Sequence, residues 1–119
     1  MVDVAKFADN GAAPGRRVHF HCPGCDDVHG VVIETLDGWG FNGDLERPTF
    51  TPSVLVHMTK WHGTFEEYGK WTRPTHPNVE PGGECTCHSF VTDGRIQFLG
   101  DCTHALAGQT VDLPPWRED

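Results

Sequence analysis

Cysteine and histidine residues gather in two short groups that lie far apart along the chain. The first group is Cys22-Pro23-Gly24-Cys25, a pair of cysteines separated by two residues. The proline and glycine between them favour a tight turn, which would direct both thiolates toward one ion. The second group, Cys85-Thr86-Cys87-His88, could supply the other half of a tetrahedral site. Because zinc prefers thiolate and imidazole ligands, the pattern predicts a Zn²⁺ site.

Two other interpretations of the cysteines stay open. A cysteine pair of this spacing also serves thiol redox chemistry, but redox pairs occur in a βαβ setting that the surrounding sequence lacks. Cys85 and Cys102 could instead be small apolar residues of the core. The chain has five cysteines, an odd number, and begins without the apolar segment of a signal peptide. We therefore expect a reducing cytoplasmic compartment, in which disulfides are rare.

The second cysteine group is predicted to lie on one strand of a β-hairpin. Asp93-Gly94 is a two-residue turn signal between the alternating residues 87–92 and 95–99. The resulting register sets Ser89 opposite Phe98. Since strand side chains alternate between faces, Cys87 and His88 share one ion only if the strand bulges. The predicted metal ligands are Cys22, Cys25 and Cys87, with Cys85, His88 or His104 as the fourth.

An acidic residue and two histidines are candidates for chemistry. Asp101 lies on the same hairpin face as His88, and His104 follows Asp101 by three residues. An imidazole acts as a base or ligand when its second nitrogen is held, and Asp101 could hold it. The predicted catalytic residues are His88, Asp101 and His104. The alternative is that Asp101 caps a helical turn and that His88 is a half-buried strand residue.

Other hydroxyl and imidazole groups are assigned to structural or exposed positions. Ser89 neighbours His88 in sequence, but adjacent strand residues point to opposite faces, so no hydrogen bond between them is expected. The residues 48–53 are bounded by prolines, and their hydroxyls are predicted to cap turns or line a pocket. His29 is a candidate partner of the ion or of a thiolate. The remaining histidines are expected to be solvated: His19, His21, His57, His62 and His76.

Short alternating or β-branched runs predict a mainly β fold. Strand-like runs occupy 18–21, 28–33, 53–57, 87–92, 95–99 and 110–113, and a helical turn is predicted from Asp101 to Gly108. We expect a small irregular β-sandwich or partial barrel with one or two short helices, stabilised by zinc. Residues 1–15 are predicted to be a flexible N-terminal tail, and 16–119 a single zinc-binding domain with a long excursion at 59–84.

Composition narrows the range of partners. The chain has 119 residues, enough for one domain. Nine Lys and Arg against 17 Asp and Glu give a net charge of −8, which disfavours binding to nucleic acid or to anionic membranes. No stretch approaches the roughly 18 apolar residues of a membrane helix. A protein or peptide is therefore the expected partner or substrate.

Several short motifs in a fixed order carry a resemblance to a known family. They are HCPGC at 21–25, WGFNGD at 39–44, RPTFTPS at 47–53, CHSF at 87–90 and GDCTHALAG at 100–108. From about His19 to Pro114, the chain resembles a small Cys/His zinc-binding family common in tailed phages and prophages. Its members often carry the label ammonia monooxygenase, an activity of membrane-embedded copper proteins that this thiolate-rich sequence does not match.

The resemblance also implies a function. Relatives in bacterial operons for ubiquitin-like conjugation look like peptidases, so a metal-associated hydrolase in the cytoplasm of a bacterial host is expected. Cys85 and Cys102 are less typical of the family pattern, which weakens a four-thiolate site that includes Cys85. The motif positions that this sequence matches are Cys22, Cys25, Cys87, His88, Asp101 and His104.

Two functions from different classes follow. A zinc ion with an open coordination position would activate water, and Asp101 or His104 would take its proton. This interpretation predicts a hydrolase that acts on peptide or isopeptide bonds of ubiquitin-like proteins. Alternatively, four protein ligands close the site, and the chain is a non-enzymatic protein-binding module. The number of protein ligands around the ion separates the two.

Overall fold

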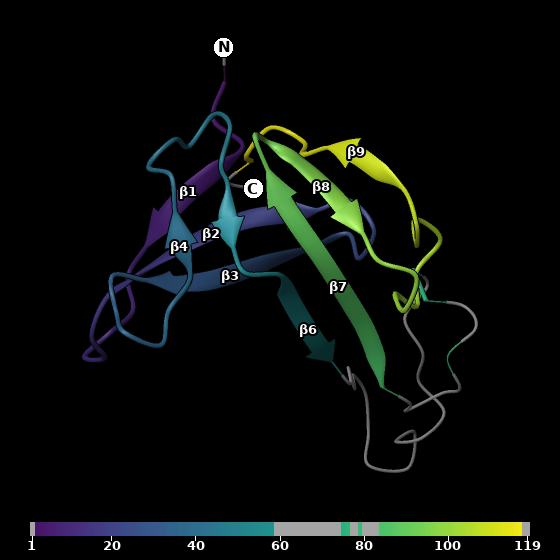
Figure 1. The fold of residues 1–119 in the computed structure, drawn as a ribbon, viewed down its shortest axis with the longest axis horizontal. Helices are drawn as coiled ribbons and strands as arrows, with labels where there is room; N and C mark the ends of the chain where they lie inside the picture. The colour runs from purple at the N-terminus through teal and green to yellow at the C-terminus, as the bar shows by residue number, and fades with distance from the viewer. Residues whose placement is uncertain (1, 59–74, 77–78, 80–83, 118–119) are drawn as a thin grey trace.

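Strands and turns make up the whole described part of the chain. The computed structural model describes residues 2–58, 75–76, 79 and 84–117, and no helix occurs among them. Within these residues, nine strands form three antiparallel sheets, β1–β2–β3, β4–β5 and β6–β7–β8–β9 (Figure 1). The mainly β prediction is confirmed, without the one or two short helices. The strands are β1 (Ala5–Ala8), β2 (Arg16–Cys22), β3 (Asp27–Ile33), β4 (Gly40–Phe41), β5 (Phe50–Thr51), β6 (Val54–Met58), β7 (Cys85–Thr92), β8 (Arg95–Phe98) and β9 (Thr110–Asp112).

The hairpin of β7 and β8 has the predicted register, with Ser89 opposite Phe98. The turn residues Asp93-Gly94 have φ angles of 51° and 78°. This left-handed conformation is the one that a two-residue hairpin turn requires and that glycine adopts without strain. Residues along β7 alternate between buried and more exposed positions. Cys87 therefore lies on the buried face and His88 on the opposite face, as the hairpin predicts.

Part of the N-terminal segment belongs to a sheet. Residues Ala5–Ala8, expected to lie in a flexible tail, pair with β2 as the edge strand β1. The N–H groups of Val4 and Ala5 donate to the carbonyl oxygen of Leu45 at 2.9 and 3.1 Å, and both residues are buried. The tail prediction is wrong for these residues. A four-residue strand is too short to show periodicity, and its stability comes from a partner strand distant in sequence.

The segment from Asp101 to Gly108 is a series of turns rather than the expected helical turn. Its backbone bonds to the hairpin: the Thr103 N–H donates to the Thr86 carbonyl at 2.9 Å, and the Gly108 N–H donates to the Phe98 carbonyl at 3.1 Å. A helix of this length is marginal by itself. Hydrogen bonds to β7 and β8 therefore determine the backbone conformation here.

The core lies between the three-stranded and the four-stranded sheets, whose strands cross one another (Figure 1). Phe50 stacks on Phe20 and on Phe41, with ring centroids 5.7 and 5.4 Å apart. Trp39 and Phe41 are partly buried and pack against this cluster. The Trp39 Nε1–H also donates to the carbonyl oxygen of Ser53 at 3.1 Å. The residue before β4 thus anchors the residue that precedes β6.

Most of the predicted excursion at 59–84 lies outside the described residues, so that prediction stays untested. Thr75, His76, Val79 and Glu84 are its described members. Among the described residues, no helix has the length and apolar composition needed to cross a bilayer.

Candidate functional site

Cys22 ends β2, and Cys25 lies in the turn that leads to β3. Both residues are buried. The Cys25 N–H donates to the Cys22 Sγ at 3.4 Å, and the Asp26 N–H donates to the Cys22 carbonyl at 2.9 Å. Hydrogen bonds to sulfur favour the thiolate form. The short turn between the two cysteines therefore holds two potential ligands together.

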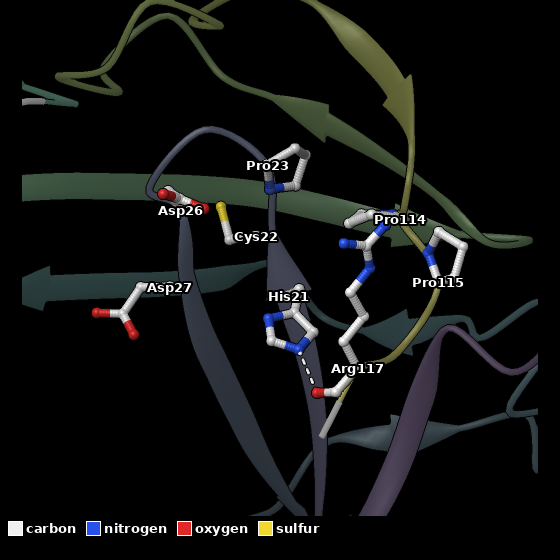
Figure 2. A pocket seen from close by; sticks show the side chains of 8 residues that line it. All are labelled: His21, Cys22, Pro23, Asp26, Asp27, Pro114, Pro115 and Arg117. Atoms are coloured by element: carbon white, nitrogen blue, oxygen red, sulfur yellow. Dashed lines mark hydrogen bonds between the residues drawn. The ribbon is translucent and has the colours of Figure 1, made fainter. Parts of the chain in front are cut away.

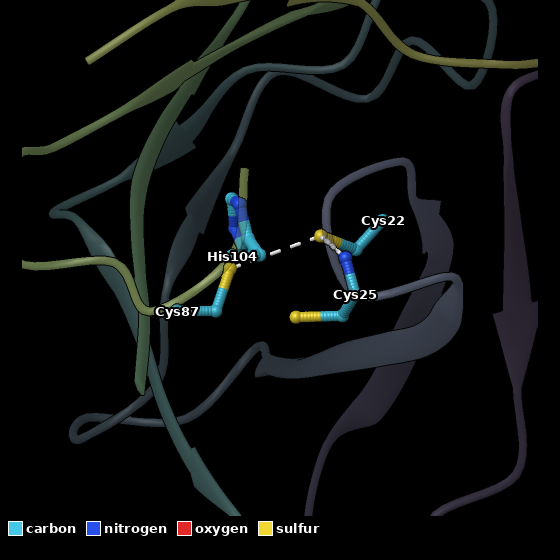
Figure 3. A group of neighbouring side chains, drawn as sticks. All are labelled: Cys22, Cys25, Cys87 and His104. Atoms are coloured by element: carbon cyan, nitrogen blue, oxygen red, sulfur yellow. Dashed lines mark hydrogen bonds between the residues drawn. The ribbon is translucent and has the colours of Figure 1, made fainter. Parts of the chain in front are cut away.

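Two further potential ligands come from the other sheet. Cys87 in β7 and His104 in the loop after β8 join Cys22 and Cys25 (Figure 3). The four ligand atoms all lie within 4.8 Å of one another, and the sulfurs of Cys22 and Cys87 are 3.7 Å apart. These four buried residues, called the cysteine–histidine group below, could hold a metal ion.

Gly24 allows the His104 ring to approach the cysteine turn. A Cβ atom at Gly24 would lie 2.3 Å from Cε1 and 2.4 Å from Nε2 of His104. The ring packs edge-on against Phe98, with centroids 4.4 Å apart. The Leu106 N–H donates to Nδ1 at 3.2 Å, whereas Nε2 is buried and has no hydrogen-bond partner in the described part of the chain. A buried nitrogen of this kind destabilises the fold unless a ligand such as a metal ion binds it.

The clustered sulfurs perturb one another. Hydrogen bonds with Cys25 and Cys87 lower the pKa of Cys22, and hydrogen bonds with Cys22 and Cys25 raise the pKa of Cys87. Buried thiolates at such short range repel, so all three ionise together only with a cation among them. Burial lowers the pKa of His104, which favours the neutral ring that binds metals.

Two more histidines lie next to this group. His29 is buried and, after the hydrogen bonds from the cysteines, contributes to lowering the pKa of Cys22. It therefore lies beside a thiolate, outside the set of four. His76 is fully buried, so its predicted surface position is wrong. Its Nδ1 lies 2.5 Å from the Thr103 hydroxyl, a contact between segments that no local pattern predicts. His62 lies outside the described residues.

The C-terminal segment packs on the outer side of the cysteine turn. His21 lies 4.6 Å from the Trp116 ring, and its Nε2–H donates to the Arg117 carbonyl at 3.1 Å. His19 and His21 are half-buried rather than solvated as expected. A cavity of about 210 Å³ lies beside the turn (Figure 2). It is lined by His21, Cys22, Pro23, Asp26, Asp27, Pro114, Pro115 and Arg117.

A second polar group lies on the opposite face of β7. His88 Nδ1 is 3.1 Å from Asp101 Oδ2, and His88 Nε2 is 3.0 Å from the Ser53 Oγ. The His88 side chain is 25% exposed and that of Asp101 56%, so solvent reaches the group. A hydroxyl, an imidazole and a carboxylate in this order can convert the hydroxyl into a nucleophile. The predicted proximity of His88 and Asp101 is present, and Ser53 completes the arrangement.

Cys102 holds the backbone of the central histidine. The His88 N–H donates to the Cys102 Sγ, and the Cys102 thiol donates to the His88 carbonyl, both at 3.2 Å. Burial raises the pKa of Cys102, which keeps the thiol proton available for donation. Cys102 is thus more than a small apolar filler, because it ties β7 to the loop that carries Asp101.

The two groups share two stretches of backbone but lie on opposite faces of β7. Cys87 and His88 are adjacent in this strand, and the loop after β8 carries both Asp101 and His104. His88, a candidate fourth ligand, lies outside the cysteine–histidine group, as does Cys85. His104, a predicted catalytic residue, lies inside it.

The sequence does not identify Ser53 as a partner of His88, and it predicts only that the hydroxyls of 48–53 cap turns or line a pocket. The signal that identifies it is the pairing of β6 with β7, in which Leu55 lies opposite His88. Alternation along the chain then favours the same side of the sheet for Ser53. The sequence does not reveal this pairing, because the excursion at 59–84 separates the two strands.

The described residues define an all-β protein with a buried cysteine–histidine group and a solvent-accessible Ser–His–Asp arrangement. The sequence model of the BubE family, described as a bacterial ubiquitination-like system serine protease, matches residues 4–99. This range covers most of the chain, and the chain belongs to that family. No curated protein and no solved structure matches it.

The family description bears on the predicted chemistry. It agrees with the expected link to ubiquitin-like conjugation and names a serine protease, whereas the sequence alone predicts a metal-dependent hydrolase. Ser53 and His88 lie inside the matched range, and Asp101 follows its end by two residues.

Proposed function

We propose that this protein is a serine protease in which Ser53 is the nucleophile, His88 the general base and Asp101 the residue that orients the imidazole. The observation that carries the proposal is the pair of distances around His88, 3.0 Å to the Ser53 hydroxyl and 3.1 Å to the Asp101 carboxylate. Each ring nitrogen has one partner, as proton transfer in such catalysis requires. The family description supports the same chemistry.

The reaction proceeds in two stages. Ser53 Oγ attacks the carbonyl carbon of the scissile bond while its proton moves to His88 Nε2, and Asp101 stabilises the imidazolium through Nδ1–H. The C–N bond breaks as His88 gives the proton to the leaving amine, which leaves an acyl ester on Ser53. Water then attacks the ester carbonyl while His88 takes its proton. The C–O bond to Ser53 breaks, His88 returns the proton to Oγ, and the carboxylic acid product leaves the free enzyme.

The cysteine–histidine group is proposed to hold Zn²⁺ as a closed structural site. Three thiolates and one imidazole are a typical donor set of structural zinc, and no position is left for an activated water. The unpartnered Nε2 of His104 and the opposed pKa shifts of Cys22 and Cys87 support the fit. A bound ion would supply four bonds between the two sheets, which compensates for the limited core of a small protein.

The proposed substrate is a peptide or isopeptide bond of a ubiquitin-like protein. The family description, which refers to a bacterial ubiquitination-like system, supports this class. A net charge of −8 also favours a protein partner over nucleic acid or an anionic membrane. The five cysteines form no disulfide bond among the described residues, which fits the reducing cytoplasm that we propose as the location.

An alkyl fluorophosphonate, which reacts covalently with activated serine hydroxyls, tests the proposal. We expect labelling of the wild type at Ser53, identified by peptide mass, and cleavage of a ubiquitin-like protein fused at its C-terminus to a fluorescent protein. Ser53→Ala should abolish both. Ser89→Ala is the matched control, because Ser89 is buried and its hydroxyl has no hydrogen-bond partner among the described residues. Equal activity of Ser53→Ala and the wild type would reject the proposal.

The second candidate is a non-enzymatic protein-binding module. The closed set of four protein ligands favours it, because such a site stabilises a fold without supplying chemistry. The same experiment separates the two functions. A folded, metal-loaded wild type that neither reacts with the fluorophosphonate nor cleaves any fusion would favour the module.

A further inference from the structure

Strand β6 has one neighbour among the described strands and begins directly after Ser53. The sheet order is β6–β7–β8–β9, so β6 is an edge strand within the described part of the chain. Its sequence, VLVHM, contains no proline, lysine or acidic residue. Natural edge strands usually carry such residues, which prevent another strand from adding. The edge next to Ser53 is therefore chemically open to an added strand.

Hydrogen bonds on β7 establish which backbone groups of β6 point toward the free edge. The His88 N–H donates to Cys102, and the His88 carbonyl accepts from the Leu99 N–H at 2.9 Å. Both groups of His88 thus point away from β6. In an antiparallel pair of this type, the opposite residue, Leu55, also directs its N–H and carbonyl outward.

The next rung repeats this pattern. The Thr86 N–H donates to the Thr103 hydroxyl, and the Thr86 carbonyl accepts from the Thr103 N–H. His57, opposite Thr86, therefore also directs its backbone groups to the free edge. Among the described residues, the backbone groups of Leu55 and His57 form no hydrogen bond on that side. Two consecutive outward-facing sites, two residues apart, are available to an extended peptide.

Two large apolar residues are exposed beside His88. Leu55 and Phe90 are 47% and 42% exposed, and both lie on the same face of the sheet as His88. Large apolar side chains that remain exposed beside a reactive group are typical of contact surfaces for a partner. A substrate residue paired with Leu55 would direct its side chain to this same face.

We propose that the substrate adds to the free edge of β6 as an antiparallel strand, with an apolar residue opposite Leu55 and the scissile carbonyl at Ser53. This inference rests on the proposed protease function and specifies how its site recognises a polypeptide. Ser53 precedes Leu55 by two residues, about 7 Å along an extended chain. In the antiparallel direction, the substrate residue bonded to Leu55 therefore lies two positions before the residue that supplies the cleaved carbonyl. Main-chain hydrogen bonds give affinity, and the apolar side chain gives specificity.

Backbone-modified substrates test the proposal. Internally quenched peptides from a random decapeptide mixture identify a cleaved sequence, and single N-methyl groups are then placed at successive amides. Methylation two positions before the cleaved residue should lower kcat/KM by about 10- to 100-fold, because it removes hydrogen bonding to Leu55. Methylation at the positions on either side of that amide should change kcat/KM less than threefold, because those groups face away from β6. Equal effects at all three amides would overturn edge pairing.

Enzyme variants test the side-chain contact. Leu55→Ala should reduce the preference for an apolar residue at the paired position at least fivefold, whereas Leu36→Ala, which removes a fully exposed leucine, is the matched control. An unchanged preference in Leu55→Ala would overturn the proposed contact. Fluorophosphonate labelling of Ser53 separates the failure of edge pairing from the failure of the protease function. Labelling without the methylation pattern, or without cleavage of any peptide, would refute edge pairing alone, and loss of labelling would refute the protease as well.

Discussion

Gly24 is the position where one added methyl group should most directly disturb the cysteine–histidine group. In Gly24→Ala, the new Cβ would lie 2.3 Å from His104 Cε1, whereas ordinary contacts begin near 3.4 Å. The three nearest atoms all belong to the imidazole, so the ring has to move by about 1.1 Å or the cysteine turn has to open. Zinc–nitrogen bonds tolerate deviations of only about 0.2 Å. The substitution should therefore break the bond between His104 and the ion.

The expected size of the effect follows from the number of ligands. Structural zinc sites bind with roughly 10–16 kcal/mol, so losing one of four ligands costs about 3 kcal/mol, or on the order of 100-fold in affinity. Competition with a chromogenic chelator measures the affinity. The absorption spectrum of the Co²⁺-loaded protein reports separately whether a nitrogen ligand has been lost.

Gly100→Ala is the matched control for this prediction. It adds the same methyl group in the loop that carries His104, but no atom lies within 4 Å of the new Cβ. We expect its metal affinity to equal that of the wild type. If Gly24→Ala bound metal as tightly as Gly100→Ala, with an unchanged Co²⁺ spectrum, His104 would not be a ligand.

Three further outcomes are expected. Asp101→Asn should lower kcat by roughly 10- to 1000-fold with little change in KM. This loss is smaller than the loss expected for a buried orienting aspartate, because the Asp101 side chain is 56% exposed. A kcat equal to that of the wild type would exclude the role of Asp101. Cys102→Ala should lower the free energy of unfolding by about 1–3 kcal/mol and reduce kcat, because it leaves the His88 N–H without its acceptor. Cys102→Ser should restore most of the stability and most of kcat. Equal unfolding of Cys102→Ala and the wild type by urea would contradict this prediction. A strong chelator should unfold the protein or lower its Tm by tens of degrees, because the free energy of binding the ion is as large as the free energy of unfolding of a whole small domain. An unchanged Tm in samples verified to be metal-free would show that the ion is not structural.

The arrangement of the two groups explains why a structural ion would matter to catalysis. Cys87 and His88 are adjacent on β7, and Asp101 and His104 lie in one loop. Holding Cys87 and His104 together on one face of the strand therefore restrains His88 and Asp101 on the other. Cys102 adds a direct link between the same two segments. Loss of the metal should consequently release the restraint on the His88–Asp101 distance and so lower activity.

Local patterns were reliable where the interacting residues are close in sequence. The Asp93-Gly94 signal led to the correct hairpin register, and alternation correctly separated Cys87 from His88. These inferences hold because turn geometry and strand pleating depend on a few neighbouring residues. The helical turn at 101–108 failed for the converse reason, since its backbone bonds to distant strands.

Residue types and spacing alone thus established a β-rich chain with a cysteine turn, a two-residue hairpin and a histidine near an aspartate. They left open which residue joins the three cysteines, and they did not place Ser53 beside His88. Packing of the two sheets brings His104 rather than Cys85 to the cysteines, and the pairing of β6 with β7 brings Ser53 to His88, 35 residues away in sequence. Such contacts depend on how separate segments pack in space, and no periodicity within one segment encodes that.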